Sequence, residues 1–230
     1  VAGNTVLGES ALDAAVTGGN NTAIGKDALS ANTSGNNNTA LGTDALEINT
    51  TGAYNVAVGT NSLDTNTSGN NNTGIGYSSL DSNTTAANNT AVGFQSLLLN
   101  TTGTQNTAVG SNALAANTTA NDNTAVGYLA LTANTTGAFN TAIGSVVLDA
   151  NTTGTRNTAV GYGSLSSLST GTGNTAFGMQ ALVSNTTADN NTAVGRDAMV
   201  SNTTGTGTAV GAFSLDANTT GTSNTAIGRS

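Results

Sequence analysis

The chain has 230 residues, of which only 7% are charged and 3% are aromatic, and it contains no Pro, Cys, His or Trp. Without His and Cys, zinc sites of the common type, thiol nucleophiles and His-based triads are excluded, so we expect neither an enzyme nor a cofactor. The 12 acidic and 4 basic residues give a net charge of −8, which argues against nucleic acid as a partner.

A five-residue motif of the type Asn-Thr-Ala-Val-Gly recurs from one end of the sequence to the other. With its glycine taken as position 0, it closes first at Gly8 and then at thirteen further glycines, each 17 residues on, except for one step of 16 between Gly195 and Gly211. A fixed period of this length is typical of a solenoid. We predict one continuous array over 1–230, a segment of a longer fibre, with an irregular first coil at 1–20 and a shortened coil at 196–211. The residue lost from the shortened coil is expected to be absorbed in its turn, so that the register of the flanking strands is kept.

The motif itself is the first predicted element of every coil, a short β-strand. Position −1 is always apolar, −2 is almost always Ala, −3 is Thr except at Val56, and −4 is Asn except at Gly207. Alternation along a strand puts Thr and the apolar residue on one face, and Asn, Ala and Gly on the other. Because neither face varies, we predict that one packs inside the coil and the other against a neighbouring chain, as in a homotrimer.

The second predicted element follows the glycine. Positions +3 and +6 hold mostly small residues, +4 holds Leu with the exception of Met199, and +7 holds Asn in most coils. On a helical wheel these positions share one arc, which predicts a short helical turn, with a second strand as the alternative. The fold class is therefore a mainly β, parallel β-roll or β-solenoid of fourteen 17-residue coils. The residues assigned to its core are Val58, Val92, Val109, Val126, Val160 and Val194 at −1, and Leu63, Leu97 and Leu114 at +4.

The asparagine columns allow two interpretations. Stacked amides can hydrogen-bond from coil to coil as a ladder, and the members considered for it are Asn89, Asn106, Asn123 and Asn140. Alternatively, the Asn-Thr-Thr sequences at 100–102, 117–119 and 151–153 are glycosylation sequons. The ladder is favoured, because it explains the same residues without a modification.

The motif Asn-Thr-Ala-Val/Ile-Gly-x-x-Ala resembles the head repeats of trimeric autotransporter adhesins (the YadA-like heads), and related repeats of phage and viral tail and surface fibres. The resemblance covers all fourteen repeats, but the family repeat is nearer fourteen residues and lacks the Leu-x-x-Asn-Thr-Thr-Gly insert found here. It implies three intertwined chains displayed outside the cell or on a virion. Adhesion to a host-surface glycan or protein receptor is the function that it implies.

Three further features bear on function. Position +1 carries Tyr77, Phe94, Tyr128 and Tyr162 in an otherwise variable column, which predicts an exposed edge for a ligand, or a seam between chains. Position +5 carries acids, among them Glu47, Asp64 and Asp81, which predict a solvated acidic edge or, less directly, a cation site. No apolar run approaches the roughly 18 residues of a membrane span, so we expect no membrane insertion.

Two alternative functions remain at this point. A ranked threonine array is typical of ice-binding solenoids, but here Thr shares its strand face with the apolar residue, which predicts a core position and argues against ice binding. The other alternative is a purely structural filament subunit. The main prediction is a structural and adhesive extracellular fibre segment.

Overall fold

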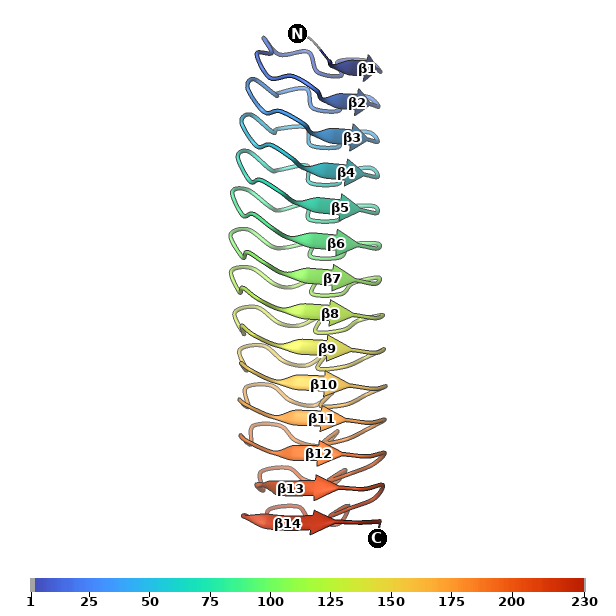
Figure 1. The fold of residues 1–230 in the computed structure, drawn as a ribbon, viewed down its shortest axis with the longest axis vertical. Coiled ribbons are helices and arrows are strands. Elements are labelled where there is room, and N and C mark those ends of the chain that lie inside the picture. The colour runs from blue at the N-terminus through green and yellow to red at the C-terminus, as the bar shows by residue number, and fades with distance from the viewer. Residues whose placement is uncertain (1–2, 230) are drawn as a thin grey trace. The chain divides into compact units, whose positions relative to one another are not determined.

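The computed structural model describes residues 3–229, which form a parallel β-solenoid of about 13 turns of roughly 17 residues, and these residues include no helix. They divide into two compact units, Val1–Thr119 and Ala120–Ser230. Figure 1 shows that each coil contributes one short strand and that, within a unit, the strands stack in chain order. Among the described residues there is consequently no helix that is long and apolar enough to cross a membrane.

The strands follow the predicted motif closely. The first unit contains β1 Thr5–Leu7, β2 Thr22–Ile24, β3 Thr39–Leu41, β4 Val56–Val58, β5 Thr73–Ile75, β6 Thr90–Val92 and β7 Thr107–Val109. The second unit contains β8 Thr124–Val126, β9 Thr141–Ile143, β10 Thr158–Val160, β11 Thr175–Phe177, β12 Thr192–Val194, β13 Gly207–Val210 and β14 Asn224–Ile227. Most of them are three residues long, shorter than the five that the motif indicated.

Within each unit every strand pairs in parallel with the strand of the next coil, and in most pairs Thr lies opposite Thr and Ala opposite Ala. The coil that is one residue short keeps this register, because Val194 of β12 lies opposite Val210 of β13. The prediction that the lost residue is absorbed in a turn is therefore confirmed. Loss of a residue inside a strand would have reversed the two faces.

The interior of the coil is filled by the small and amide residues of the strand and not by its large apolar ones. Ala at −2 and Asn at −4 are buried in nearly every coil, whereas Thr at −3 and the apolar residue at −1 point outward and are partly exposed. The opposite wall supplies the large side chain, Leu at +4, which leaves room on the strand only for Ala. The predicted core residues Leu63, Leu97 and Leu114 are accordingly buried.

The valines that sequence analysis assigned to the core were assigned to the wrong face of the single chain. They lie on the outer surface of the sheet and are partly exposed: Val58, Val92, Val109, Val126, Val160 and Val194. The expectation that Thr lines the core is wrong for the same reason, since Thr shares their face.

The segment after the glycine is neither a helical turn nor a second strand, so that prediction is corrected. It is a run of turns in which position +2 and position +4 both have positive φ, and the leucine or methionine at +4 has φ of 49° to 54° in every coil that contains it. The left-handed conformation costs about 1–2 kcal/mol per residue, and complete burial of a leucine contributes about 1.5–3 kcal/mol. Backbone bonds to the next coil, such as Leu29 N to Ala45 O at 3.0 Å, satisfy the polar groups.

Asparagine ladders run through the interior of both units. In the column at −4, the backbone amide of Asn106 donates to Asn89 Oδ1 and the backbone amide of Asn140 donates to Asn123 Oδ1, each at 2.9 Å. The column at +7 forms a second ladder, in which Asn100 Nδ2 donates to Asn83 Oδ1 at 3.1 Å. The sequon asparagines belong to this second column and are fully buried, so their amides are inaccessible in the folded chain.

Candidate functional site

The outer face of the sheet is the most regular surface of the molecule. We call it the threonine–apolar face, formed in each unit by position −3 and position −1 of every strand. Its apolar members include exposed residues such as Ile75, 39% exposed, and Phe177, 55% exposed. Among the described residues, the hydroxyls of the −3 threonines make no hydrogen bond to the protein. This face therefore offers unused hydroxyl groups beside a column of apolar side chains.

Its constancy separates this face from the other exposed columns. Position −1 is apolar in all fourteen coils and position −3 is Thr in thirteen, although both point outward. Position +1 also points outward, and there the residues include Lys26, Tyr77, Ser111, Met179 and Arg196. Packing inside the chain does not explain the constancy, because the buried residues are those at −4, −2, +3, +4, +7 and +10.

The aromatic edge at position +1 is exposed, as an edge for a ligand requires. Tyr77 and Phe94, in adjacent coils of the first unit, stack with ring centroids 5.5 Å apart and planes 13° from parallel. Tyr128 and Tyr162 lie in the second unit and are 54% and 58% exposed. The stack covers one face of each of the first two rings, whereas the two tyrosines of the second unit stand in coils separated by Ser145 at the same position.

The acidic column at +5 brings carboxylates together in the first unit. Partial burial, with Glu47 and Asp81 nearby, raises the pKa of Asp64 to about 6, and burial also raises the pKa of Asp81. In the part of the chain that the structure describes, no group of three or more acidic side chains is arranged to hold a metal ion. Asp64 therefore binds a proton at a higher pH than an exposed aspartate does.

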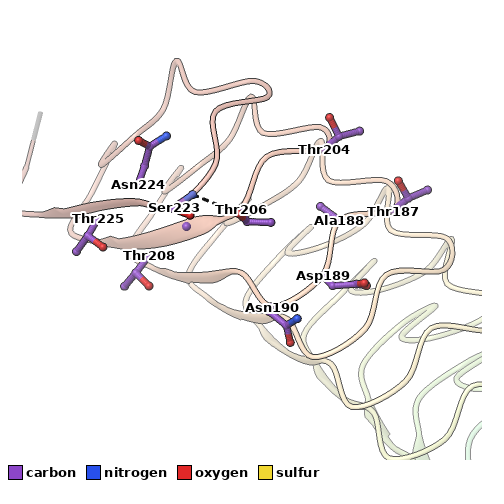
Figure 2. Close-up of a pocket in the computed structure, with 11 residues that line it drawn as sticks. Thr187, Ala188, Asp189, Asn190, Thr204, Thr206, Thr208, Ser223, Asn224 and Thr225 are labelled. Atoms are coloured by element: carbon purple, nitrogen blue, oxygen red, sulfur yellow. Dashed lines mark hydrogen bonds between the residues drawn. The ribbon is translucent and has the colours of Figure 1, made fainter.

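A hollow of the second unit lies at the shortened coil (Figure 2). It has a volume of about 680 Å³ and is lined mainly by hydroxyl and amide side chains, together with one carboxylate, Asp189. We call it the corner notch. Its lining residues are Thr187, Ala188, Asp189, Asn190, Thr204, Thr206, Gly207, Thr208, Ser223, Asn224 and Thr225.

The corner notch is a feature that sequence analysis missed, although its signal was visible. The 16-residue step identified the shortened coil, but only the register of the strands was deduced from it.

No protein-family model matches the chain, and a search of curated proteins finds no match either. The assignment of function consequently depends on these surfaces alone.

Proposed function

We propose that this chain is a structural and adhesive segment of an extracellular fibre, and that its threonine–apolar face packs against copies of the same chain in a homotrimer. The single observation that carries the proposal is that two outward-facing columns hardly vary: position −1 is apolar in all fourteen coils and position −3 is Thr in thirteen. An outward position that meets only water tolerates many residues, as position +1 does. A position that meets an identical partner in every coil does not.

The chemistry of the face suits such an interface. Burying the apolar column at −1 between chains removes exposed apolar surface from water, at about 25 cal/mol per Å². Each Thr hydroxyl can both donate and accept a hydrogen bond, so threonines of neighbouring chains can pair with one another. A 17-residue coil encloses little apolar volume by itself, and association supplies additional burial.

Adhesion is assigned to the columns that vary. The constant columns are committed to the interior or to the interface, whereas the aromatic edge is exposed and irregular. Aromatic rings suit the apolar faces of sugars and protein side chains, and three chains present the edge three times, which increases avidity. The partner of this edge is a host-surface glycan or protein, and no catalytic role is proposed.

Replacement of Tyr77, Phe94, Tyr128 and Tyr162 by Ser tests the adhesive part of the proposal. We expect binding to target cells or to a glycan array to be lost, while the melting temperature stays within about 2 °C of the parent. A collapse of the melting temperature, or unchanged binding, contradicts the assignment of adhesion to this edge.

Ice binding is the second candidate function, and one observation favours it. The −3 threonines face outward, in register, on successive strands about 4.8 Å apart. A regular outward array of hydroxyl and apolar groups is the kind of surface that can order water. The array differs from the Thr-x-Thr pattern common in ice-binding solenoids, because its second member is aliphatic in most coils.

Two measurements separate the two functions. A trimer that does not inhibit ice recrystallisation supports the fibre, and a monomer that does inhibit it supports ice binding. The variant Thr158→Tyr, on the outer face of β10, adds a check: in an ice-binding monomer it abolishes inhibition without changing the melting temperature. In a trimer it reduces assembly instead, because the larger side chain cannot be accommodated between tightly packed strands.

A further inference from the structure

The corner notch exists because one residue of the repeat is absent. In a regular coil two residues, at +11 and −5, turn the corner between the buried Gly or Ala at +10 and the Asn at −4, as Asp189 and Asn190 do. The shortened coil passes from Gly205 through Thr206 directly to Gly207. The corner residue at −5 is therefore missing, and the coils on either side project beyond this one.

The hydrogen bonds around the notch differ from those of the regular coils. In a regular coil the amide of the −5 residue donates to the backbone carbonyl at +11 of the preceding coil, as Asn190 N does to Thr172 O at 3.0 Å. At the notch, the Ser223 amide donates instead to the side-chain Oγ1 of Thr206, at 3.3 Å (Figure 2). Gly207 cannot be replaced by a larger residue to fill the space, because a Cβ there comes within 2.6 Å of Asn224 O.

The side chains that surround the notch are held in place by the fold. Asp189 Oδ1 accepts a hydrogen bond from the backbone amide of Thr172 at 2.6 Å, which fixes the carboxylate and leaves Oδ2 outside this bond. Figure 2 shows Asp189 and Asn190 on one coil, and Thr206 and Ser223 on the two coils that follow. The coils that flank the notch are separated by one coil, so its opening along the stack is roughly 10 Å.

From this geometry we infer that the corner notch is a binding site for a small neutral carbohydrate, one or two sugar rings in size. Its volume lies in the range of about 300–1,000 Å³ that is usual for small-molecule sites. Hydroxyl, amide and carboxylate groups provide both donors and acceptors, which is the combination that sugar hydroxyls require. The inference is independent of the proposed assembly, since the notch is complete within one chain.

The charge of the lining narrows the class of ligand. Asp189 is the only ionisable residue among the lining residues, and no Lys or Arg is among them. An anionic ligand such as a phosphate or a sialic acid meets a carboxylate without a compensating cation, and the net charge of −8 adds to the repulsion. A neutral sugar avoids this cost and can donate a hydroxyl to the carboxylate, which is the stronger kind of hydrogen bond.

The direct test fills the notch with the missing residue. The variant keeps Gly207 and carries one additional Asn inserted between Thr206 and Gly207, which restores a coil of 17 residues. Saturation-transfer difference NMR is then recorded on parent and variant with glucose, galactose, mannose and N-acetylglucosamine, and with N-acetylneuraminic acid as the anionic probe. We expect transfer to at least one neutral sugar in the parent, no transfer to the anionic probe, and no transfer to any sugar in the variant.

A second variant keeps the test decisive if the insertion disturbs folding. Asp189→Asn retains an oxygen for the Thr172 amide but loses the charge, and we expect it to weaken sugar binding roughly fivefold to tenfold at an unchanged melting temperature. Absence of transfer to every neutral sugar in the parent overturns the inference. Equal transfer in the correctly folded insertion variant also overturns it, and assigns the sugar to another surface such as the aromatic edge. Neither result affects the proposal about the threonine–apolar face, because the mass of the assembly is measured separately.

Discussion

Leucine at position +4 shows how a single residue type maintains this fold. It adopts a backbone conformation that non-glycine residues rarely take, and it does so in coil after coil because its side chain is the largest that fills the interior. The same side chain two residues further on, at +6, points outward in Leu99, which is 46% exposed whereas Leu97 is fully buried. The role of a leucine is therefore decided by its position in the coil.

This pair provides a matched test within one coil. We expect Leu97→Ala to lower the free energy of unfolding by about 2–5 kcal/mol, because it leaves a cavity among tightly packed neighbours. The control Leu99→Ala removes the same atoms from an exposed site and should change it by no more than about 0.5 kcal/mol. Chemical denaturation measures both, and equal effects of the two variants are incompatible with the assigned interior.

A prediction for pH dependence follows from Asp64. Burial and the neighbouring carboxylates Glu47 and Asp81 raise its pKa to about 6 in the folded chain, whereas an unfolded aspartate titrates near 3.9. Between these values the folded state binds a proton that the unfolded state does not, so its contribution to stability is fully present below about pH 4. That contribution is lost as the pH rises through 6.

We therefore expect the melting temperature to rise when the pH is lowered from 7.5 to 4.5. Asp64→Asn should raise the melting temperature at pH 7.5 and flatten this part of the profile. Ala115→Asn, in the same column but without loss of an ionisable group, is the control and should leave the slope unchanged. If the melting temperature of Asp64→Asn changes with pH as steeply as that of the parent, the pH dependence comes from other groups.

At the scale of the elements, the period, the strand in each coil and the register across the shortened coil could all be predicted from sequence. The inward face of the strand could not. The alternation of side chains along a strand places Asn and Ala on one face and Thr and Val on the other, but it does not say which face is buried. Hydrophobicity alone predicts that the face with Val is the buried one. The structure places Ala and Asn inside, because Leu from the opposite wall occupies the volume and the amides satisfy one another.

The turn segment was mispredicted for a related reason. Its spacing of small residues, Leu and Asn is compatible with a helix, and propensity scales contain no term for a leucine held at positive φ by burial. The shortened coil illustrates a different limit, because the missing corner residue is plain in the sequence. The absence of this residue opens a notch only because the neighbouring coils project beyond the shortened one. That projection is a property of the folded chain and could not be deduced from the sequence.

The asparagine ladder makes a testable contribution at this scale. Asn140 Oδ1 accepts a bond from the Asn157 amide at 3.0 Å, and Asn140 Nδ2 donates to Gly154 O at 2.8 Å, all in the interior. We expect Asn140→Ala to cost about 1–3 kcal/mol, because it leaves the buried backbone amide of Asn157 without a partner. Gly154 O keeps the bond that it accepts from Asn151 Nδ2 at 3.1 Å. The exposed Thr153→Ala is the control, with an expected change of at most about 0.5 kcal/mol.

Amide hydrogen exchange gives a local measure of the same ladder. The Asn157 amide should exchange at least tenfold faster in Asn140→Ala than in the parent, while the amide of Asn106, in the ladder of the first unit, is unchanged. Unchanged protection at Asn157 contradicts a stabilising role for the side-chain bond.

At the scale of the whole molecule, the proposed assembly predicts that a charged residue at position −1 disrupts the association of chains but not the fold of the single chain. Val160 lies on the outer face and is partly exposed in the single chain. We expect Val160→Asp to prevent association, since each chain would bury an unpaired carboxylate at a cost of several kcal/mol. The isolated chain should remain folded, because in it the carboxylate faces water.

The control for this variant is Tyr162→Asp, two residues further along the same coil and 58% exposed. It introduces the same charge at the variable column, and we expect the mass in solution to equal that of the parent. Loss of assembly in both variants instead places the aromatic edge at the seam between chains. Circular dichroism of each variant checks that the solenoid itself is intact.

The most direct test of the central claim is the mass of the chain in solution by multi-angle light scattering, measured on the parent and on Val160→Asp. The account predicts a parent species of three times the 22.3 kDa chain mass, and a folded single chain for Val160→Asp. A parent that is a stable, monodisperse monomer of 22.3 kDa contradicts the claim that the threonine–apolar face joins copies of this chain.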